Sequence, residues 1–119
     1  MKERTRAKVA ATVAAATLNT QVLKVTDLDE GTVYRIRALM RHGRVDGFDC
    51  HSEHHFKGMS SHSMNFYDYE TKAHVHLKLV GSKILGYDLA TETAFNGQVH
   101  GRLINLYDYE TEQTYRFTV

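Results

Sequence analysis

A short motif built around Asp recurs through the chain at nearly constant spacing. It consists of an aromatic residue, Asp, two variable residues, and Ser or Thr, and its four copies start at Phe48, Tyr67, Tyr87 and Tyr107. The intervals of 19, 20 and 20 residues suit a unit of one β-hairpin together with the connection to the next hairpin. We therefore predict four successive hairpins over residues 33–119, ending in one further strand.

Each copy of the motif follows a candidate tight turn, whose second residue lies six positions before the Asp. Gly81-Ser82 and Gly101-Arg102 put Gly first, as type II′ turns do, whereas His42-Gly43 puts Gly second. Ser61-His62 occupies the equivalent position without Gly. If all four are two-residue turns, counting outward from them gives the pairing of each hairpin and the face on which each side chain lies.

The counted register predicts which face of the sheet is buried. The expected core pairs are Met40 with Val45, Leu79 with Ile84, and Val99 with Ile104. In the second hairpin the same face holds His55 and Lys57, and His55 is expected directly opposite Asp68. These polar residues are the exceptions on a face that is otherwise apolar.

Residues 1–19 have the strongest helix propensity in the chain, because they are rich in Ala and contain neither Gly nor Pro. Small residues on the core face of the predicted sheet leave room for such a helix. They are Ala38, Gly47, Gly86 and Gly97. Residues 21–32 are expected to add a strand and a turn. The predicted fold is mainly β: an N-terminal helix and an antiparallel meander of about nine or ten short strands, forming an open curled sheet or a partly closed barrel.

Length and composition exclude several classes of protein. A chain of 119 residues, 42% apolar and 24% charged, is expected to form a single domain over residues 1–119. One cysteine, Cys50, excludes a disulfide framework or a four-thiolate zinc site within one chain. No apolar run approaches the ~18 residues of a membrane-spanning helix, so no membrane partner is expected. A net charge of +1 argues against general nucleic-acid binding.

The lone cysteine fits a reducing compartment, and we expect a cytoplasmic location. Export is the alternative, because basic residues precede the Ala-rich stretch as they do in signal peptides. The sequence contains no Gly-rich phosphate loop and no arrangement of a nucleophile with its base. We therefore predict no cofactor, no catalytic residue and no enzymatic activity.

The repeated Asp has two interpretations. Asp at a strand end, followed by a hydroxyl three residues later, is typical of turns in which the carboxylate accepts backbone N–H bonds. The alternative is a row of calcium loops using Asp68 with Glu70 and Asp108 with Glu110. Consecutive copies lie two strands apart, about 9–10 Å, which is too far for one calcium ion to use both. We expect turn chemistry.

Histidines concentrate between His42 and His76, which suggests a metal site. The counted register places His51, His55 and Asp68 near one end of the second hairpin. A cross-strand hydrogen bond between His55 and Asp68 is the favoured interpretation, and a metal site formed by all three residues is the alternative.

The opposite, outer face of the predicted sheet carries a row of aromatic and basic side chains. The residues expected to form a binding surface there are Arg35, Arg37, Phe48, Phe56, Tyr67, His76, Tyr87 and Tyr107. Arg41 and Arg44 extend the basic part of this surface. Tyr and Arg are enriched where proteins bind one another, and a row of rings also offers a stacking platform for flat ligands.

These observations predict a non-enzymatic binding module that uses the outer face of the sheet. A protein partner or a second copy of the chain is the expected ligand, a small ligand is possible, and nucleic acid is not expected. Two alternatives stay open: a closed barrel that carries an apolar small molecule in its interior, and a metal-binding protein that uses the histidine cluster. Residues 1–45 carry a net charge of +5 and residues 46–119 a net charge of −4, which favours head-to-tail self-association.

Overall fold

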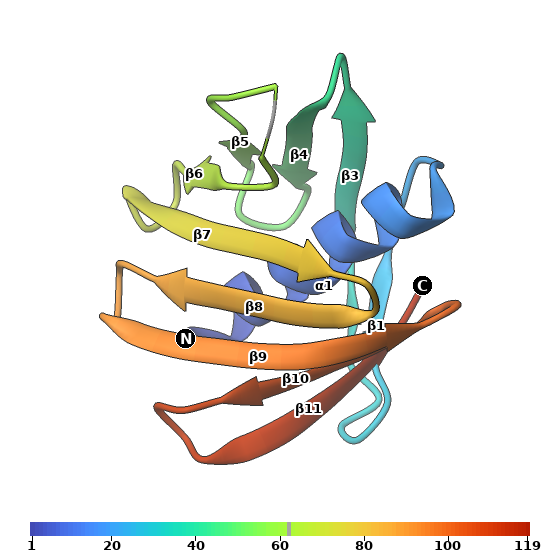
Figure 1. Cartoon of the computed structure of the whole chain (residues 1–119), viewed down its shortest axis with the longest axis vertical. Helices are drawn as coiled ribbons and strands as arrows, with labels where there is room; N and C mark the ends of the chain where they lie inside the picture. The colour runs from blue at the N-terminus through green and yellow to red at the C-terminus, as the bar shows by residue number, and fades with distance from the viewer. Residues whose placement is uncertain (62) are drawn as a thin grey trace.

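The computed structural model of the chain describes residues 1–61 and 63–119. One helix, α1 (Glu3–Leu18), is followed by eleven strands within these residues, and the strands form an antiparallel meander around it (Figure 1). The strands are β1 (Val25–Asp27), β2 (Val33–Tyr34), β3 (Ile36–Arg41), β4 (Arg44–Asp49), β5 (His54–Lys57), β6 (Phe66–Asp68), β7 (Ala73–Val80), β8 (Lys83–Asp88), β9 (Thr93–His100), β10 (Leu103–Asp108) and β11 (Gln113–Thr118).

The sheet nearly closes on itself through one stretch of chain, residues 33–41. Only Arg35 separates β2 from β3, yet β2 pairs with β1 and β3 pairs with β4, so these two strands form the two edges of the sheet. Ala38 in β3 also forms a bridge with Val22, which precedes β1. The two edge strands, β2 and β3, are thus consecutive in the chain. The sheet therefore has the shape of a nearly closed barrel.

The interior of the sheet is filled by α1. All its residues from Thr5 to Ala15 are buried, because Ala and Val side chains let the surrounding strands approach from every side. The helix packs against β1, β3, β4 and β10, and it ends at Asn19, which adopts a left-handed conformation with φ of 49°. The space that a ligand-carrying barrel would need therefore holds the helix.

The predicted fold class is confirmed: an N-terminal helix is followed by an antiparallel meander. The meander has eleven strands rather than nine or ten within the described residues, because residues 21–35 contribute two short ones. In the first, third and fourth hairpins the counted register is also confirmed. The observed core pairs are Met40 with Val45, Leu79 with Ile84, and Val99 with Ile104.

In the second hairpin the predicted register is wrong by one residue. Phe56, not His55, pairs with Asp68, so Phe56 is fully buried and His55 and Lys57 point to solvent. Residues 58–65 connect the two strands by a longer path than a two-residue turn, and His62 lies outside the described residues. The start of the strand is set instead by the preceding Asp turn, since Phe56 lies seven residues after Asp49, as Phe95 does after Asp88.

Two of the glycines make room for aromatic rings rather than for the helix. A Cβ atom on Gly86 would lie 2.1 Å from the ring of Phe95, its partner on the next strand. A Cβ atom on Gly47 would likewise lie 2.2 Å from the ring of Phe56, its partner on the next strand. The missing side chains at Gly47 and Gly86 thus let each Phe lie across the neighbouring strand, an arrangement in which the ring compensates for the glycine.

Candidate functional site

The repeated Asp residues form turns, as the motif predicts. One carboxylate oxygen of each accepts a hydrogen bond from the backbone N–H two residues later. These bonds join Asp49 to His51 (3.0 Å), Asp68 to Glu70 (3.0 Å), Asp88 to Ala90 (3.1 Å) and Asp108 to Glu110 (3.0 Å). Asp27 makes the same bond with Asp29, at 2.9 Å, and is a fifth copy that the sequence analysis missed because no aromatic residue precedes it.

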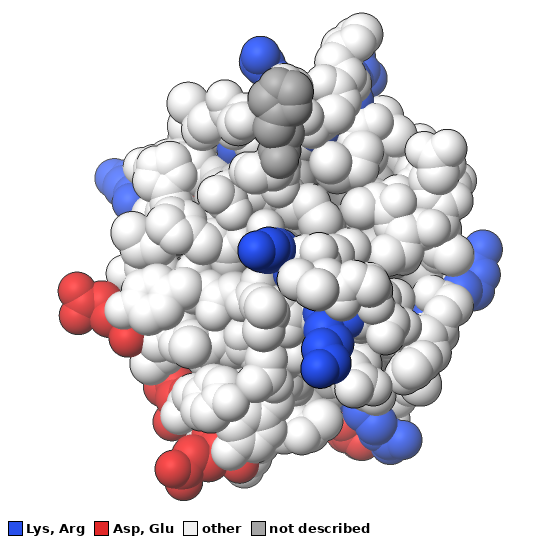
Figure 2. Space-filling model, in the orientation of Figure 1, with Lys and Arg blue, Asp and Glu red and all other residues white. Residues whose placement is uncertain are grey.

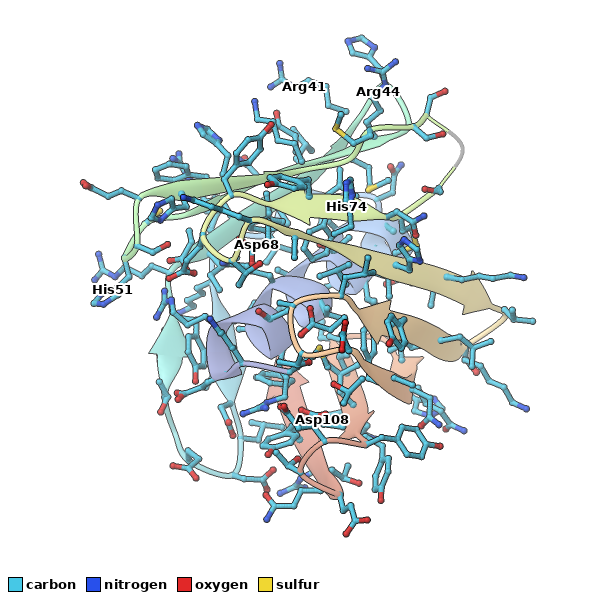
Figure 3. All side chains as sticks on the ribbon, turned by 90° about the vertical axis from the view of Figure 1, so that its left-hand side faces the viewer. Arg41, Arg44, His51, Asp68, His74 and Asp108 are labelled. Carbon is cyan, nitrogen blue, oxygen red and sulfur yellow. The ribbon has the colours of Figure 1, made fainter. Side chains whose placement is uncertain are left out.

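The carboxylates of three of these turns also face cations of α1. The ammonium group of Lys8, which has no exposed surface, donates to both oxygens of Asp68 at 3.0 and 2.9 Å and to Glu70 at 2.7 Å. Arg4 donates to Asp49 through two guanidinium nitrogens. We call these groups, with Arg6 and Asp108, the buried ion cluster; Figure 3 shows Asp68 and Asp108 directed toward the helix.

The acidic pairs considered for calcium bind protein cations instead. Asp68 and Glu70 hold Lys8, whereas Asp108 and Glu110 accept hydrogen bonds from the backbone nitrogen of Met1 at 2.9 and 2.7 Å. Buried charges of one sign are stable only when they are paired, and here each cation meets at least one carboxylate. The cluster therefore anchors the first turns of α1 inside the sheet.

Hydrogen bonds determine the ionisation of Asp49 within this cluster. Burial opposes its charged form, but the guanidinium group of Arg4 and the backbone N–H groups of His51 and Ser52 outweigh burial and lower the pKa of this carboxyl. Asp49 is therefore an anion at neutral pH, despite having no exposed side-chain surface.

The structure does not assemble the alternative metal site. Both oxygens of Asp68 accept hydrogen bonds from Lys8, and His55 lies on the outer face with its ring 4.8 Å from that of Phe48. The predicted hydrogen bond between His55 and Asp68 is also wrong, for the same reason of register. His51 lies in the turn after β4. Within residues 1–61 and 63–119 no three His, Cys, Asp or Glu side chains are grouped so that they could hold a metal ion.

A line of rings crosses the outer face of five neighbouring strands, and we call it the aromatic stripe. Its members are Phe48 on β4, His55 on β5, Tyr67 on β6 with Tyr69 just after it, His74 and His76 on β7, and Tyr87 on β8. All are partly or fully exposed. Figure 3 labels His74 among the side chains on the outside of the sheet.

The rings around Tyr67 hold one another by edge contacts. Tyr67 contacts both Tyr69 and His74 with ring centroids 4.9 Å apart and interplanar angles of 76° and 72°. The guanidinium carbon of Arg37 lies 5.3 Å from the ring centroid of Phe48. Such contacts orient the rings while leaving much of their surface open, which suits them to contact a partner.

A shallow pocket of about 300 Å³ interrupts the aromatic stripe. It is lined by His55, Lys57 and Tyr69, together with Glu53 and His54. Apolar ring surface and charged groups of both signs meet here, so that a side chain with an apolar stem and a polar end would find contacts for both parts.

Two residues of the predicted binding surface lie elsewhere, and a third, Tyr107, lies on the outer face as expected but apart from the aromatic stripe. Phe56 is in the core, so its assignment to the outer face was wrong. Tyr107 is separated from Tyr87 by β9, and it packs against Tyr109 with centroids 4.8 Å apart. Arg35 lies at the break between β2 and β3, where it lines a different cleft. Arg37, Phe48, Tyr67, His76 and Tyr87 occupy the outer face as expected.

The predictions from sequence did not include His55, Tyr69 and His74 among the members of the outer surface. His55 was placed on the core face by the error in register. Tyr69 is the third residue of a motif copy, where strand alternation no longer applies because the chain enters the Asp turn. For His74 the signal was present, since it lies two residues before His76 on the same strand.

Comparison with known proteins gives no match: no family model, no curated protein and no solved structure matches the chain. Among the described residues, α1 is the only helix, and no helix has the length and apolar character needed to cross a membrane. Inference about function therefore depends on the geometry of the surface.

Proposed function

We propose that the protein is a non-enzymatic binding module that recognises a protein partner through the aromatic stripe. One observation carries this proposal: seven rings from five neighbouring strands lie on the outer face, five of them in contact with another ring, and all remain partly or fully exposed. Proteins commonly use Tyr, His and Arg in this way, because a ring with a polar edge tolerates water when the surface is free and excludes it when the surface is covered.

The shape of the surface favours a macromolecule over a small ligand. The aromatic stripe runs along an open sheet face, and the pocket within it is shallow and only partly apolar. Small molecules usually bind in enclosed, largely apolar cavities, whereas protein interfaces are broad and concentrate their binding energy in a few aromatic and Arg side chains. Tyr69 and Tyr87, which are 48% and 40% exposed, are the side chains most available to act as such anchors.

Site-specific photocrosslinking in cells tests this proposal. A benzophenone amino acid replaces Tyr87 in one variant and Val33, an exposed apolar residue on β2 outside the aromatic stripe, in the control variant. We expect a discrete crosslinked protein from the Tyr87 position that is absent from the Val33 position. Equal adducts from both positions, or none from Tyr87 while the fold is intact, would refute the aromatic stripe as the binding surface.

A further inference from the structure

Acidic residues are concentrated at one end of the molecule. Every acidic residue except Glu3 and Asp46 lies in the five Asp turns, at residues 27–31, 49–53, 68–72, 88–92 and 108–112. The connections at the opposite end contain no acidic residue. The basic residues in these connections, or at the strand ends that flank them, are Lys24, Arg41, Arg44, Lys83 and Arg102. In Figure 2 most of the visible acidic side chains gather at the lower left, whereas basic ones are spread over the top, centre and right of the view and also appear at its upper left.

A cleft of about 500 Å³ opens at the basic end, between the β3–β4 turn and the segment that follows β5. It is lined by Arg41, Arg44 and Lys57, together with Gly58 and Ser61. The cleft is thus formed by two connections that lie side by side. Arg41 and Arg44 project from the top of the view in Figure 3.

The cations of this cleft are not neutralised. Asp46 is the carboxylate among its lining residues, and it lies 3.3 Å from Arg41 and 3.9 Å from Lys57. Arg44 forms no ion pair with any residue that the structure describes. Three cations therefore share one carboxylate, and the cleft carries an excess of positive charge.

The register adds a second observation. Arg41 and Arg44 are directly paired across the β3–β4 hairpin, at the positions that flank its turn. Like charges in directly opposed positions destabilise a sheet. An anion bound between the two guanidinium groups would reverse this repulsion, because it would accept hydrogen bonds from both.

We propose that this cleft is a binding site for a phosphate-bearing ligand. The planar guanidinium groups of Arg41 and Arg44 provide paired N–H donors that match phosphate oxygens, and Lys57 adds a third positive charge. Asp46 forms ion pairs with both Arg41 and Lys57 at this cleft. The positive field of this whole end attracts such a ligand although the chain as a whole is nearly neutral. This site does not depend on the function proposed for the aromatic stripe.

Titration with inorganic phosphate and pyrophosphate, followed by backbone amide NMR at constant ionic strength, tests the site. We expect the amide signals of Arg44 and Gly58 to shift in a saturable way, with pyrophosphate binding more tightly than phosphate. The Arg44→Gln variant should weaken pyrophosphate binding by about tenfold or more, since it removes a charge-assisted donor. The control variant Lys83→Gln removes a cation from the same end but outside the cleft, and it should change the affinity less than about twofold.

Two results would overturn the proposal. Equal weakening by Arg44→Gln and Lys83→Gln would show that the general field of the basic end, not the cleft, attracts the anion. Shifts that grow in proportion to the anion concentration and do not saturate would show that no site exists. Both variants change exposed side chains, and an unchanged melting temperature for each confirms that loss of binding is not loss of fold.

Discussion

Replacing Lys8 with Met removes the ammonium group at the centre of the buried ion cluster. Lys8 has no exposed surface, and its three hydrogen bonds reach Asp68 and Glu70. Met has a similar volume, so the packing of α1 is largely retained. The change leaves a carboxylate of Asp68 buried without a counter-charge.

The size of the effect follows from that uncompensated charge. Breaking a buried ion pair by removing one partner costs about 3–5 kcal/mol, a large part of the roughly 5–15 kcal/mol by which a domain of this size is stable. The expected fall in melting temperature is about 10–30 °C, at roughly 3–6 °C for each kcal/mol. Urea unfolding followed by circular dichroism measures the free energy directly, provided that the slope against denaturant is unchanged.

Two further variants separate charge from packing. The double variant Lys8→Met with Asp68→Asn removes both charges, and we expect it to recover at least about half of the lost stability. Lys57→Met removes an exposed cation and should change stability by less than about 0.5 kcal/mol. If Lys8→Met costs less than about 1 kcal/mol, or if the double variant is as unstable as the sum of its single changes, the reasoning is wrong.

Three other predictions concern the sheet and its turns. In urea unfolding, Phe56→Ala should lower the free energy of unfolding by about 3–5 kcal/mol, whereas His55→Ala should lower it by less than about 0.5 kcal/mol. The reverse order would contradict the observed register and support the one counted from the sequence. Gly86→Ala should lower the stability by about 1–3 kcal/mol, because the new Cβ meets the ring of Phe95; an unchanged melting temperature would contradict this. The folded pKa of Asp49 is lowered, so its contribution is complete above an unfolded pKa of about 3.9 and is lost as the pH falls through the folded pKa. Below about pH 4, the free energy of unfolding should therefore fall less steeply with decreasing pH in Asp49→Asn than in the unchanged protein. Parallel curves of this free energy against pH for the two proteins would refute the prediction.

Most of the fold could be predicted because each copy of one motif indicates both a turn and the end of the strand before it. The aromatic–Asp repeat and the glycine turns determine the register of three hairpins, as the pairs of Leu79 with Ile84 and Val99 with Ile104 confirm. The register of the second hairpin was predicted wrongly because its connection, residues 58–65, is longer than the two-residue turn from which the pairs were counted, and a one-residue error exchanges the two faces. Phe56 and His55 were therefore each placed on the wrong side.

The buried ion cluster could not be predicted from the motif alone. Arg4, Arg6 and Lys8 have the sequence pattern of a solvated helix end, and nothing local indicates that a sheet encloses them. Only the closure of the sheet through residues 33–41 brings the Asp turns around the first turns of α1. The outer face was more accessible to prediction, because strand alternation applies there wherever the register is known.

The most direct test of the account is the affinity of the crosslinked partner for three forms of the protein. These are the unchanged protein, the variant Tyr69→Ser with Tyr87→Ser, and the control Leu23→Ser with Val33→Ser, which removes exposed apolar side chains outside the aromatic stripe. Anchor tyrosines contribute about 2 kcal/mol or more, so the account predicts at least a tenfold loss of affinity in the tyrosine variant and less than a twofold change in the control. An unchanged affinity in a folded tyrosine variant would contradict the claim that the aromatic stripe is the binding surface.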